Sequence, residues 1–211
     1  MDARLKWYDK NEWIIWIRKR SVAAFFGFYK HRFLMTIAIL VIDIQSALID
    51  PEPRPFDIKN VLSKINTITS WARNAKYPVI FVQHEKIESV IEYESKGWQL
   101  QSNLSVIAGD IVIRKTTPDA FLRTNLENVL IKNEVTHLII TGYASEFCVD
   151  TTVRKAASLG YSVDLISDAH TTHNKEHASG EKIQTHQNCT LPEITSFGVK
   201  ISAIKTDALV Q

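Results

Sequence analysis

From residue 36 onward, short runs of apolar, mostly β-branched residues alternate with segments whose apolar residues recur at helical spacing. Such continuous apolar runs are typical of strands buried on both faces of a parallel sheet. The alternation predicts an α/β protein, a three-layer α/β/α sandwich with a mostly parallel, Rossmann-like six-stranded sheet. The predicted strands cover residues 36–43, 78–85, 110–115, 136–142, 161–167 and 198–204, and the predicted helices cover 57–76, 121–133, 149–160 and the region around 177–187.

Three of the predicted strands end in, or are followed by, an ionisable side chain that can take part in acid–base catalysis. Asp43 follows the first strand, His84 lies at the end of the second, and Lys115 at the end of the third. In open parallel sheets, ligands bind beyond the carboxyl ends of the strands, where the strand order reverses. The loop to Cys148 follows the fourth strand, so the pattern predicts that an acid, a base and a thiol meet at one edge. Two structural roles remain as alternatives to chemistry at this edge: Asp43 caps a loop, and Lys115 is a solvated cation at a strand end.

One of the two cysteines, Cys148, lies where the fourth predicted strand passes into a helix, in the stretch GYASEFCVDTT. Ser145 is a good N-cap candidate, which would place Cys148 in the first helical turn. Unpaired backbone N–H groups and the positive end of the helix dipole favour a thiolate there. A small buried apolar residue is the simpler interpretation of a lone cysteine, and Cys189 fits such a structural role.

Together, these residues have the parts of a cysteine hydrolase, which needs a thiolate, a group that takes and returns its proton, and donors for an oxyanion. Asp43 is suited to accept the thiol proton and to pass it to the leaving group. Lys115 is suited to hold that carboxylate and to favour the thiolate by its charge. Backbone N–H groups at the start of the helix would meet the oxyanion.

Composition narrows the class of protein without identifying it. The chain has 211 residues, of which 45% are hydrophobic and 23% charged, as in an ordinary globular protein. A net charge of +2 is too small to indicate a nucleic-acid partner. Two cysteines without a disulfide-like spacing favour a reducing, cytoplasmic location.

The first 34 residues differ from the rest of the chain. Residues 1–34 carry many aromatic side chains and two basic clusters, and we predict that they form an N-terminal arm preceding one domain at 35–211. The apolar stretches of the arm are too short for a stable membrane span. The arm is expected to dock on its own domain or on a partner subunit, with an amphipathic membrane-surface helix as the alternative. Within the domain, residues 86–109 are expected to form an irregular insertion or lid.

Over residues 36–205, the chain resembles the isochorismatase-like cysteine hydrolases. The resemblance is carried by VIDIQ, VIRKTTPDAF and GYASEFCVDTT, in this order at the predicted strand ends. It implies a catalytic triad of Asp43, Lys115 and Cys148 that cleaves a carbon–nitrogen bond through a thioester, without a cofactor. The family usually has threonine where this chain has Ser145, which keeps the hydroxyl group.

The same resemblance implies further features of the site. The N–H groups of Ala144 and Cys148 would form the oxyanion hole, next to a cis peptide bond between Tyr143 and Ala144. A homodimer or larger homo-oligomer is also implied.

Details within the family narrow the substrate. RKTTPDAF, EFCVDTT, SLGY and DAHTT look like a subgroup that includes streptothricin hydrolase, which implies a small-molecule amide or lactam as substrate. Metal-dependent nicotinamidases carry an aspartate and histidines beyond the second strand, where this chain reads FVQHEKIES. The branch that acts on isochorismate itself lacks the nucleophilic cysteine, so Cys148 argues against vinyl-ether hydrolysis.

Other side chains are candidates for the substrate pocket or for a metal site. The pocket candidates, each with a structural role as its alternative, are Gln45, His84, Trp98, Phe121, Tyr143 and Phe147. A polar histidine-rich segment is predicted to be a solvated loop and helix start rather than a metal site; its histidines are His170, His173, His177 and His186. We therefore expect no metal and no other cofactor. A catalytically idle α/β domain for binding or assembly is the alternative function.

Overall fold

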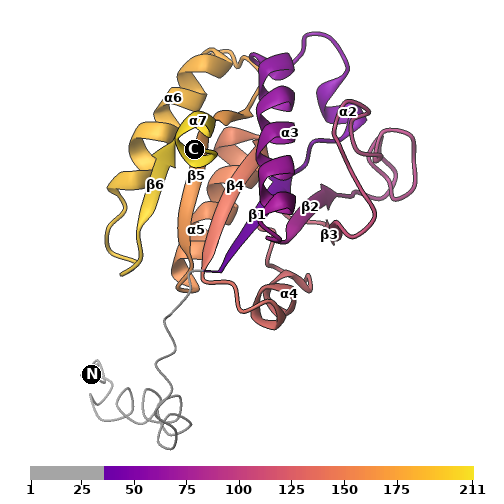
Figure 1. Ribbon diagram of the computed structural model, residues 1–211. Helices are drawn as coiled ribbons and strands as arrows, with labels where there is room; N and C mark the ends of the chain where they lie inside the picture. Colours follow the sequence, from indigo (N-terminus) through magenta and orange to yellow (C-terminus); the bar gives the residue numbers. More distant parts are fainter. Residues whose placement is uncertain (1–35) are drawn as a thin grey trace, which may run out of the picture. The chain divides into compact units, whose positions relative to one another are not determined.

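The computed structural model of the protein describes residues 36–211. The predicted N-terminal arm, residues 1–34, lies outside the described residues. The described part is built on a six-stranded sheet in the order β3-β2-β1-β4-β5-β6, and every strand pair is parallel (Figure 1). The strands are β1 Ile37–Ile42, β2 Val79–His84, β3 Ile111–Lys115, β4 His137–Tyr143, β5 Ser162–Thr171 and β6 Ile201–Ile204. The six predicted strands are thus confirmed.

The central strand β1 shows why the apolar runs have no alternation. All six of its residues are buried, and it pairs with β2 on one side and with β4 on the other. Its even-numbered residues belong to the core on one face of the sheet, and its odd-numbered residues belong to the core on the opposite face. A strand that serves two cores must be apolar at every position.

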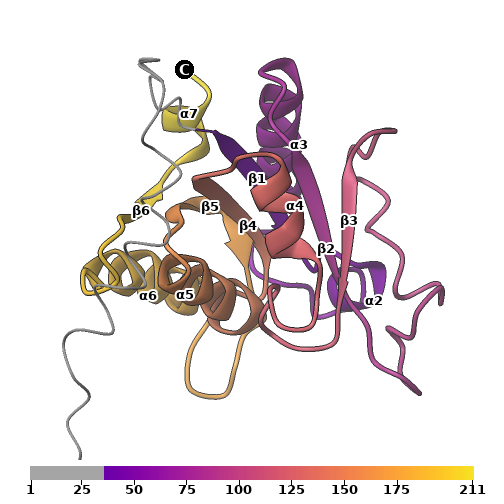
Figure 2. The same ribbon diagram turned by 90° about the horizontal axis from the view of Figure 1, so that it is seen from below.

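Helices cover both faces of this sheet, which gives three layers (Figure 2). The long helix α3, Ile58–Asn74, packs on one face, and α7, Thr206–Leu209, contacts α3. On the opposite face, α4 and α5 contribute to the core, and α6 packs against β5. The remaining bounds are α2 Ser46–Ile49, α4 Leu126–Lys132, α5 Asp150–Ser158, α6 Gly180–Thr190 and a 3₁₀ turn at Leu191–Glu193. The predicted three-layer α/β/α sandwich is confirmed.

Three elements differ in length from the prediction, and the last strand, expected over 198–204, covers only Ile201–Ile204. The helix expected over 121–133 begins at Leu126, because the Thr124 hydroxyl donates to the carbonyl of Ala120 at 2.7 Å and holds the preceding residues in a turn. Strand β5 continues to Thr171 instead of ending near residue 167. As expected, residues 86–109 contain no helix and no regular strand.

The strand order reverses between β1 and β4, since β2 and β3 lie on one side of this pair and β5 and β6 on the other. Connections leave such a reversal in opposite directions, which opens a crevice at the carboxyl ends of the strands. Asp43 and Ala144 directly follow β1 and β4. The fold therefore provides a ligand site at the edge that the sequence indicated.

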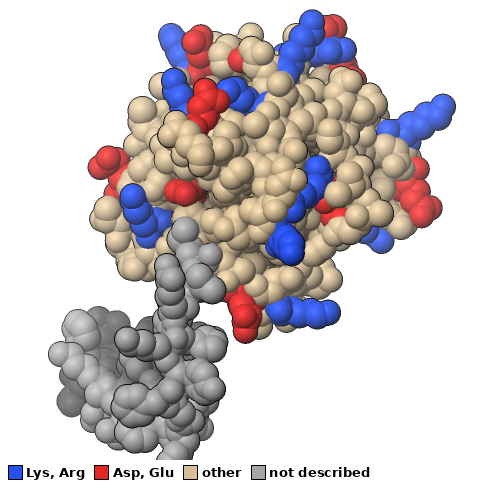
Figure 3. Space-filling view, viewed as in Figure 1, with Lys and Arg blue, Asp and Glu red and all other residues tan. Residues whose placement is uncertain are grey.

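Two surface properties of the described part bear on possible partners. No helix within residues 36–211 is long and apolar enough to cross a membrane. On the face seen in Figure 3, basic and acidic side chains are interspersed, so this face has no extended surface of one charge.

Candidate active site

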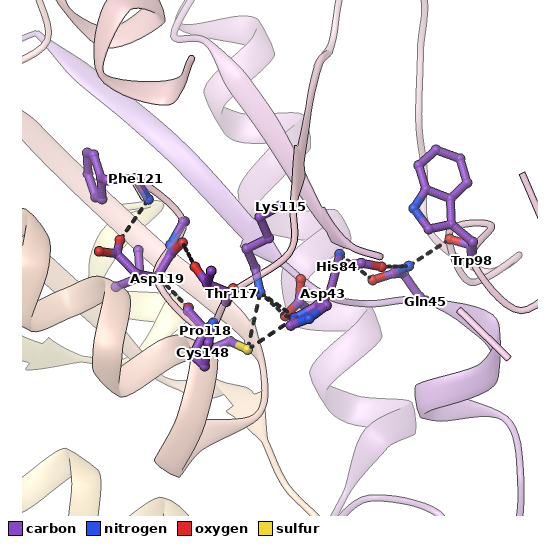
Figure 4. A network of polar contacts seen from close by, with 12 residues as sticks. Asp43, Gln45, His84, Trp98, Lys115, Thr117, Pro118, Asp119, Phe121 and Cys148 are labelled. Carbon is purple, nitrogen blue, oxygen red and sulfur yellow. Dashed lines mark hydrogen bonds and ion pairs between the residues drawn. The ribbon is translucent and has the colours of Figure 1, made fainter. Parts of the chain in front are cut away.

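Asp43, Lys115 and Cys148, which are far apart in the sequence, meet at this edge of the sheet (Figure 4). The Lys115 ammonium donates to Asp43 Oδ2 at 2.7 Å and to Cys148 Sγ at 3.2 Å. It also lies 3.0 Å from Nδ1 of His84 and 3.1 Å from the carbonyl oxygen of Thr117. Lys115 is only 2% exposed. A buried charge must be paired. Here the ammonium contacts four acceptor atoms, which come from four different segments of the chain.

The strands determine where these side chains lie. His84 and Lys115 are the last residues of β2 and β3, and they pair with each other in the register of the two strands. Asp43 follows β1 with a φ of 51°, a left-handed conformation that is uncommon for a residue with a Cβ. Its N–H donates to the Val82 carbonyl at 2.8 Å. The turn at Asp43 thus ends β1 and stays attached to β2 while the carboxylate reaches the ammonium.

Cys148 lies in a π turn, Ser145–Val149, that leads directly into α5. The Ala144 carbonyl accepts from the N–H of Phe147 at 3.0 Å and from that of Val149 at 3.2 Å, and the second bond spans five residues. The prediction of an N-cap at Ser145 is wrong, because Ala144 occupies that position and no side chain caps the turn. Turns of this kind are rare and occur frequently at functional sites.

The backbone just before the π turn has two unusual features. The Tyr143–Ala144 peptide bond, for which the family resemblance implies the cis form, is cis in the structure. Gly142 has a φ of 121°, and a Cβ at this position would lie 2.1 Å from the carbonyl oxygen of Ile42. A side chain would therefore push β4 away from β1. Glycine keeps the two strand ends, and hence the residues that follow them, close together.

Burial and the neighbouring charges favour the protonated thiol of Cys148 over the thiolate. Burial raises its pKa to about 12, and the negative charge of Asp43 adds to the effect, whereas Lys115 opposes it. Sequence analysis favours a thiolate, and the structure reverses that expectation because the ammonium is already paired with the carboxylate of Asp43. A thiolate would add an uncompensated negative charge to a buried site.

We therefore expect iodoacetamide to alkylate Cys148 at pH 7 more slowly than Cys189, which is exposed. Only the thiolate reacts, and its fraction rises about tenfold per pH unit at any pH well below the pKa. Peptide mass spectrometry between about pH 7 and pH 9 resolves the two cysteines. Faster labelling of Cys148 at pH 7 would mean that its attraction to Lys115 outweighs burial.

His84 joins the cluster as a neutral ring. Burial, and then the positive charge of Lys115, lower its pKa. Because an ammonium can only donate, Nδ1 of His84 must accept from Lys115, which places the ring proton on Nε2. The His84 side chain is 21% exposed, so the ring lies between the buried cluster and solvent.

Asp43, His84 and Cys148 are also side chains of the kinds that bind metal ions, and their ligand atoms lie within 4.8 Å of one another. However, the Lys115 nitrogen contacts the same atoms at 2.7, 3.0 and 3.2 Å. A cation would have to compete with the ammonium for these acceptors and would be repelled by it. The donor set therefore does not fit a metal while Lys115 is charged, and the absence of a metal stays a prediction.

Two of the pocket candidates use their side chains inside the protein. Gln45 is fully buried, and its Nε2 donates to the carbonyl oxygens of His84 and Trp98, both at 2.9 Å. Its Oε1 accepts from the His84 N–H at 2.8 Å. Gln45 thus clamps the end of β2 to the 86–109 segment. Phe121 is buried in the core and stacks on Tyr161.

The other aromatic candidates differ in their exposure. Trp98 is largely buried and packs edge-on against Tyr93, with 5.0 Å between the ring centroids. The hydroxyl of Tyr143 lies 2.9 Å from Nδ1 of His173. Phe147, directly before the cysteine, is 53% exposed. Among these aromatic side chains, Phe147 is therefore the most available to contact a ligand.

Sequence analysis misjudges one residue near the site and misses one contact within it. His170 is fully buried in the extended β5, so the segment that begins there is not solvated throughout, and the prediction is corrected at this residue. Thr117 contributes its backbone carbonyl to Lys115. Every residue has a backbone carbonyl, so the residue type at position 117 does not indicate this contact. His170 has polar neighbours in the sequence and therefore resembles a surface residue. Only the resemblance of RKTTPDAF to the family marked the segment around Thr117.

The fold and the site define a doubly wound, all-parallel α/β protein with a buried acid, a lysine and a cysteine at its switch point. Residues 37–193 match the family model of the isochorismatase domain. The chain therefore belongs to the isochorismatase family, as its motifs predicted.

The relatives include hydrolases with known substrates. Streptothricin hydrolase of Streptomyces noursei is 33% identical over 144 residues, which cover 68% of this chain but only 57% of that protein. The ureidoacrylate amidohydrolase RutB of Caulobacter vibrioides is 26% identical over 171 residues, covering 64% of this chain and 76% of that protein. A crystal structure of an isochorismatase family protein, 34% identical, gives a TM-score of 0.71 and covers 80% of this chain and 98% of that one. The predicted likeness to a streptothricin hydrolase-like subgroup is confirmed.

Proposed function

We propose that this protein is a cofactor-independent hydrolase that cleaves a carbon–nitrogen bond, in an amide or a lactam, of a small molecule. The observation that carries the proposal is the buried Lys115 ammonium, which contacts both the Asp43 carboxylate and the Cys148 sulfur. A buried ion pair is weak evidence for stability, since apolar residues of similar volume often stabilise as well. Its presence beside a thiol therefore favours a catalytic role. The similarity to a streptothricin hydrolase and to an amidohydrolase supports this type of bond.

In the proposed reaction, Cys148 is the nucleophile and Asp43 is the base. Moving the proton from the thiol to the carboxylate leaves the total charge of the cluster unchanged, so the thiolate forms without adding charge to a buried site. Asp43 Oδ1 is buried and has no hydrogen-bond partner within the described part of the chain. This oxygen is the free acceptor for the proton, while Lys115 stabilises the new thiolate.

The thiolate then attacks the substrate carbonyl, forming a carbon–sulfur bond and an oxyanion that the N–H groups of Ala144 and Cys148 stabilise. The carbon–nitrogen bond breaks, and the leaving nitrogen takes the proton from Asp43. Water, deprotonated by Asp43, attacks the resulting thioester. The acid product leaves, and the proton returns to the sulfur of Cys148. Lys115 stays charged throughout and keeps acid and sulfur together.

A screen of small amides and lactams for the release of amine or ammonia tests this proposal. We expect hydrolysis of at least one compound, with an acyl group on Cys148 detected by mass spectrometry after a rapid acid quench. EDTA should leave the rate unchanged, because the ammonium occupies the position that a cation would need. Activity lost to EDTA and restored by a divalent metal would contradict the mechanism. No hydrolysis and no adduct would favour the alternative of an idle binding domain.

A further inference from the structure

The first residue of the π turn is attached to the sheet by its side chain. Ser145 is fully buried, and its hydroxyl lies 2.8 Å from Nδ1 of His170 in β5. His170 is fully buried as well. A buried serine hydroxyl must find a partner, and here the partner comes from a neighbouring strand instead of from the turn itself.

The direction of these hydrogen bonds follows from Asn188 in α6. Its amide nitrogen donates to the carbonyl of Ser167 at 3.0 Å, which leaves its amide oxygen facing Nε2 of His170 at 2.9 Å. Since that oxygen can only accept, Nε2 of His170 carries the ring proton. Burial lowers the pKa of His170 to about 4, so the ring is neutral near pH 7. Its Nδ1 is therefore an acceptor, and Ser145 donates to it.

The path of β5 explains why His170 reaches the turn. Leu165 pairs with Ile140 of β4, and the next pair is His170 with Gly142, so β5 contains extra residues between these two pairs. This irregularity places His170 beside Gly142, two residues before Ala144. The side-chain amide of Gln184 also donates to the carbonyl of His170 and holds its backbone.

A second contact attaches the next residue of the turn. The hydroxyl of Thr172, two residues beyond His170, donates to Oε1 of Glu146 at 2.9 Å. Two consecutive residues of the π turn, Ser145 and Glu146, are thus held by β5 and by the residue that directly follows it. The turn that carries Cys148 is therefore also held by contacts that involve no part of the triad.

We propose that His170, oriented by Asn188, is a positioning residue that holds Ser145 and thereby sets the placement of Cys148 and of the Ala144 N–H. Ser145 directly follows Ala144, so fixing its side chain restricts the peptide units on which the oxyanion donors lie. A displacement of about 1 Å in a reacting group can lower a rate by about a hundredfold. The inference rests on the proposed hydrolase function and adds a residue that touches neither the substrate nor the triad.

Ser145→Ala and Ser145→Thr form the matched pair that tests this role. We expect Ser145→Ala to lower kcat at least about tenfold with little change in KM, because the chemical step depends on geometry that binding does not. Ser145→Thr keeps the hydroxyl and should restore most of the activity. Asn188→Leu, which removes only the acceptor that orients His170, should lower kcat in the same way. Wild-type kcat in Ser145→Ala, or equal losses in the alanine and threonine variants, would overturn the proposal.

A control variant separates positioning from general stability. Thr69 is another fully buried hydroxyl residue, and its hydrogen bond to the carbonyl of Asn66 stays within α3. Thr69→Val should lower the melting temperature to a similar extent, since each variant loses one buried hydrogen bond, but it should leave kcat unchanged. If kcat fell equally in Thr69→Val, the loss of activity in Ser145→Ala would be explained by lower stability and not by positioning.

Nuclear magnetic resonance tests the inference independently of any substrate. In the wild-type protein near pH 7, Nε2 of His170 should be protonated and Nδ1 should not. The amide signals of Ala144 and Cys148 should shift in Ser145→Ala and stay near their wild-type positions in Ser145→Thr. Protonated Nδ1, or unshifted amide signals in Ser145→Ala, would overturn the positioning role even if hydrolysis is found. Failure of the amide screen alone would instead refute the proposed function.

Discussion

Replacing Cys148 by alanine is expected to abolish hydrolysis and to leave the fold intact. Without the sulfur no thioester can form, and removal of a catalytic nucleophile typically lowers turnover by about 10⁴-fold or more. Cys148 is a small, partly buried side chain at the border of the core. Its truncation should therefore change the free energy of unfolding by only about 1 kcal/mol. Amine release from a compound identified in the screen measures the first effect, and thermal unfolding measures the second.

Cys189→Ser is the control for this experiment. Cys189 is the other free cysteine and is exposed near the end of α6. Its replacement should leave both turnover and the acyl adduct unchanged. Turnover in Cys148→Ala close to that of the wild type, or an adduct that moves to Cys189, would show that Cys148 is not the nucleophile.

Asp43→Asn is expected to separate the reactivity of the thiol from turnover. An amide cannot accept the thiol proton or return it to the leaving group, so turnover should fall at least about a hundredfold. The negative charge that helps to raise the pKa of Cys148 is also removed, while Lys115, which lowers this pKa, remains. The pKa of the thiol should therefore fall. We expect iodoacetamide to label Cys148 faster at pH 7 in this variant than in the wild type.

Both readouts are measured on the same preparation, with Glu85→Gln as a matched control. Glu85 directly follows β2, as Asp43 follows β1, but its side chain pairs with Arg114 at 2.7 Å instead of with Lys115. This substitution should change neither the hydrolysis rate nor the labelling rate appreciably. Wild-type turnover in Asp43→Asn would contradict the role of Asp43 as base, and slower labelling would contradict its effect on the thiol.

The fold was predictable because the apolar runs leave little freedom. A strand such as β1, apolar at all six positions, can be buried only between two helical layers. Parallel strands joined by crossovers present their carboxyl ends at one edge of the sheet. Asp43 and Lys115 follow or end such strands, so both were expected at that edge. The motif around Cys148 placed the third member at the same edge.

Other details could not be read from local pattern. Gln45 was a candidate for the substrate pocket, but the left-handed turn at Asp43 ends β1 at Ile42. The side chain of Gln45 is then used to hold the backbone of His84. Similarly, Ser145 has the residue type of an N-cap, yet its hydroxyl bonds to His170, a partner 25 residues away in the sequence.

The sequence by itself determined which chemical groups stand at the ends of the strands, because strand formation and sheet burial follow from the local order of apolar and polar residues. Only the tertiary structure decided their protonation and their bonding. The pKa of Cys148 rises or falls with burial and with its distances to Asp43 and Lys115, which come from other strands. Electrostatic energies in a poorly hydrated interior depend strongly on such distances, and no local pattern along the chain encodes them.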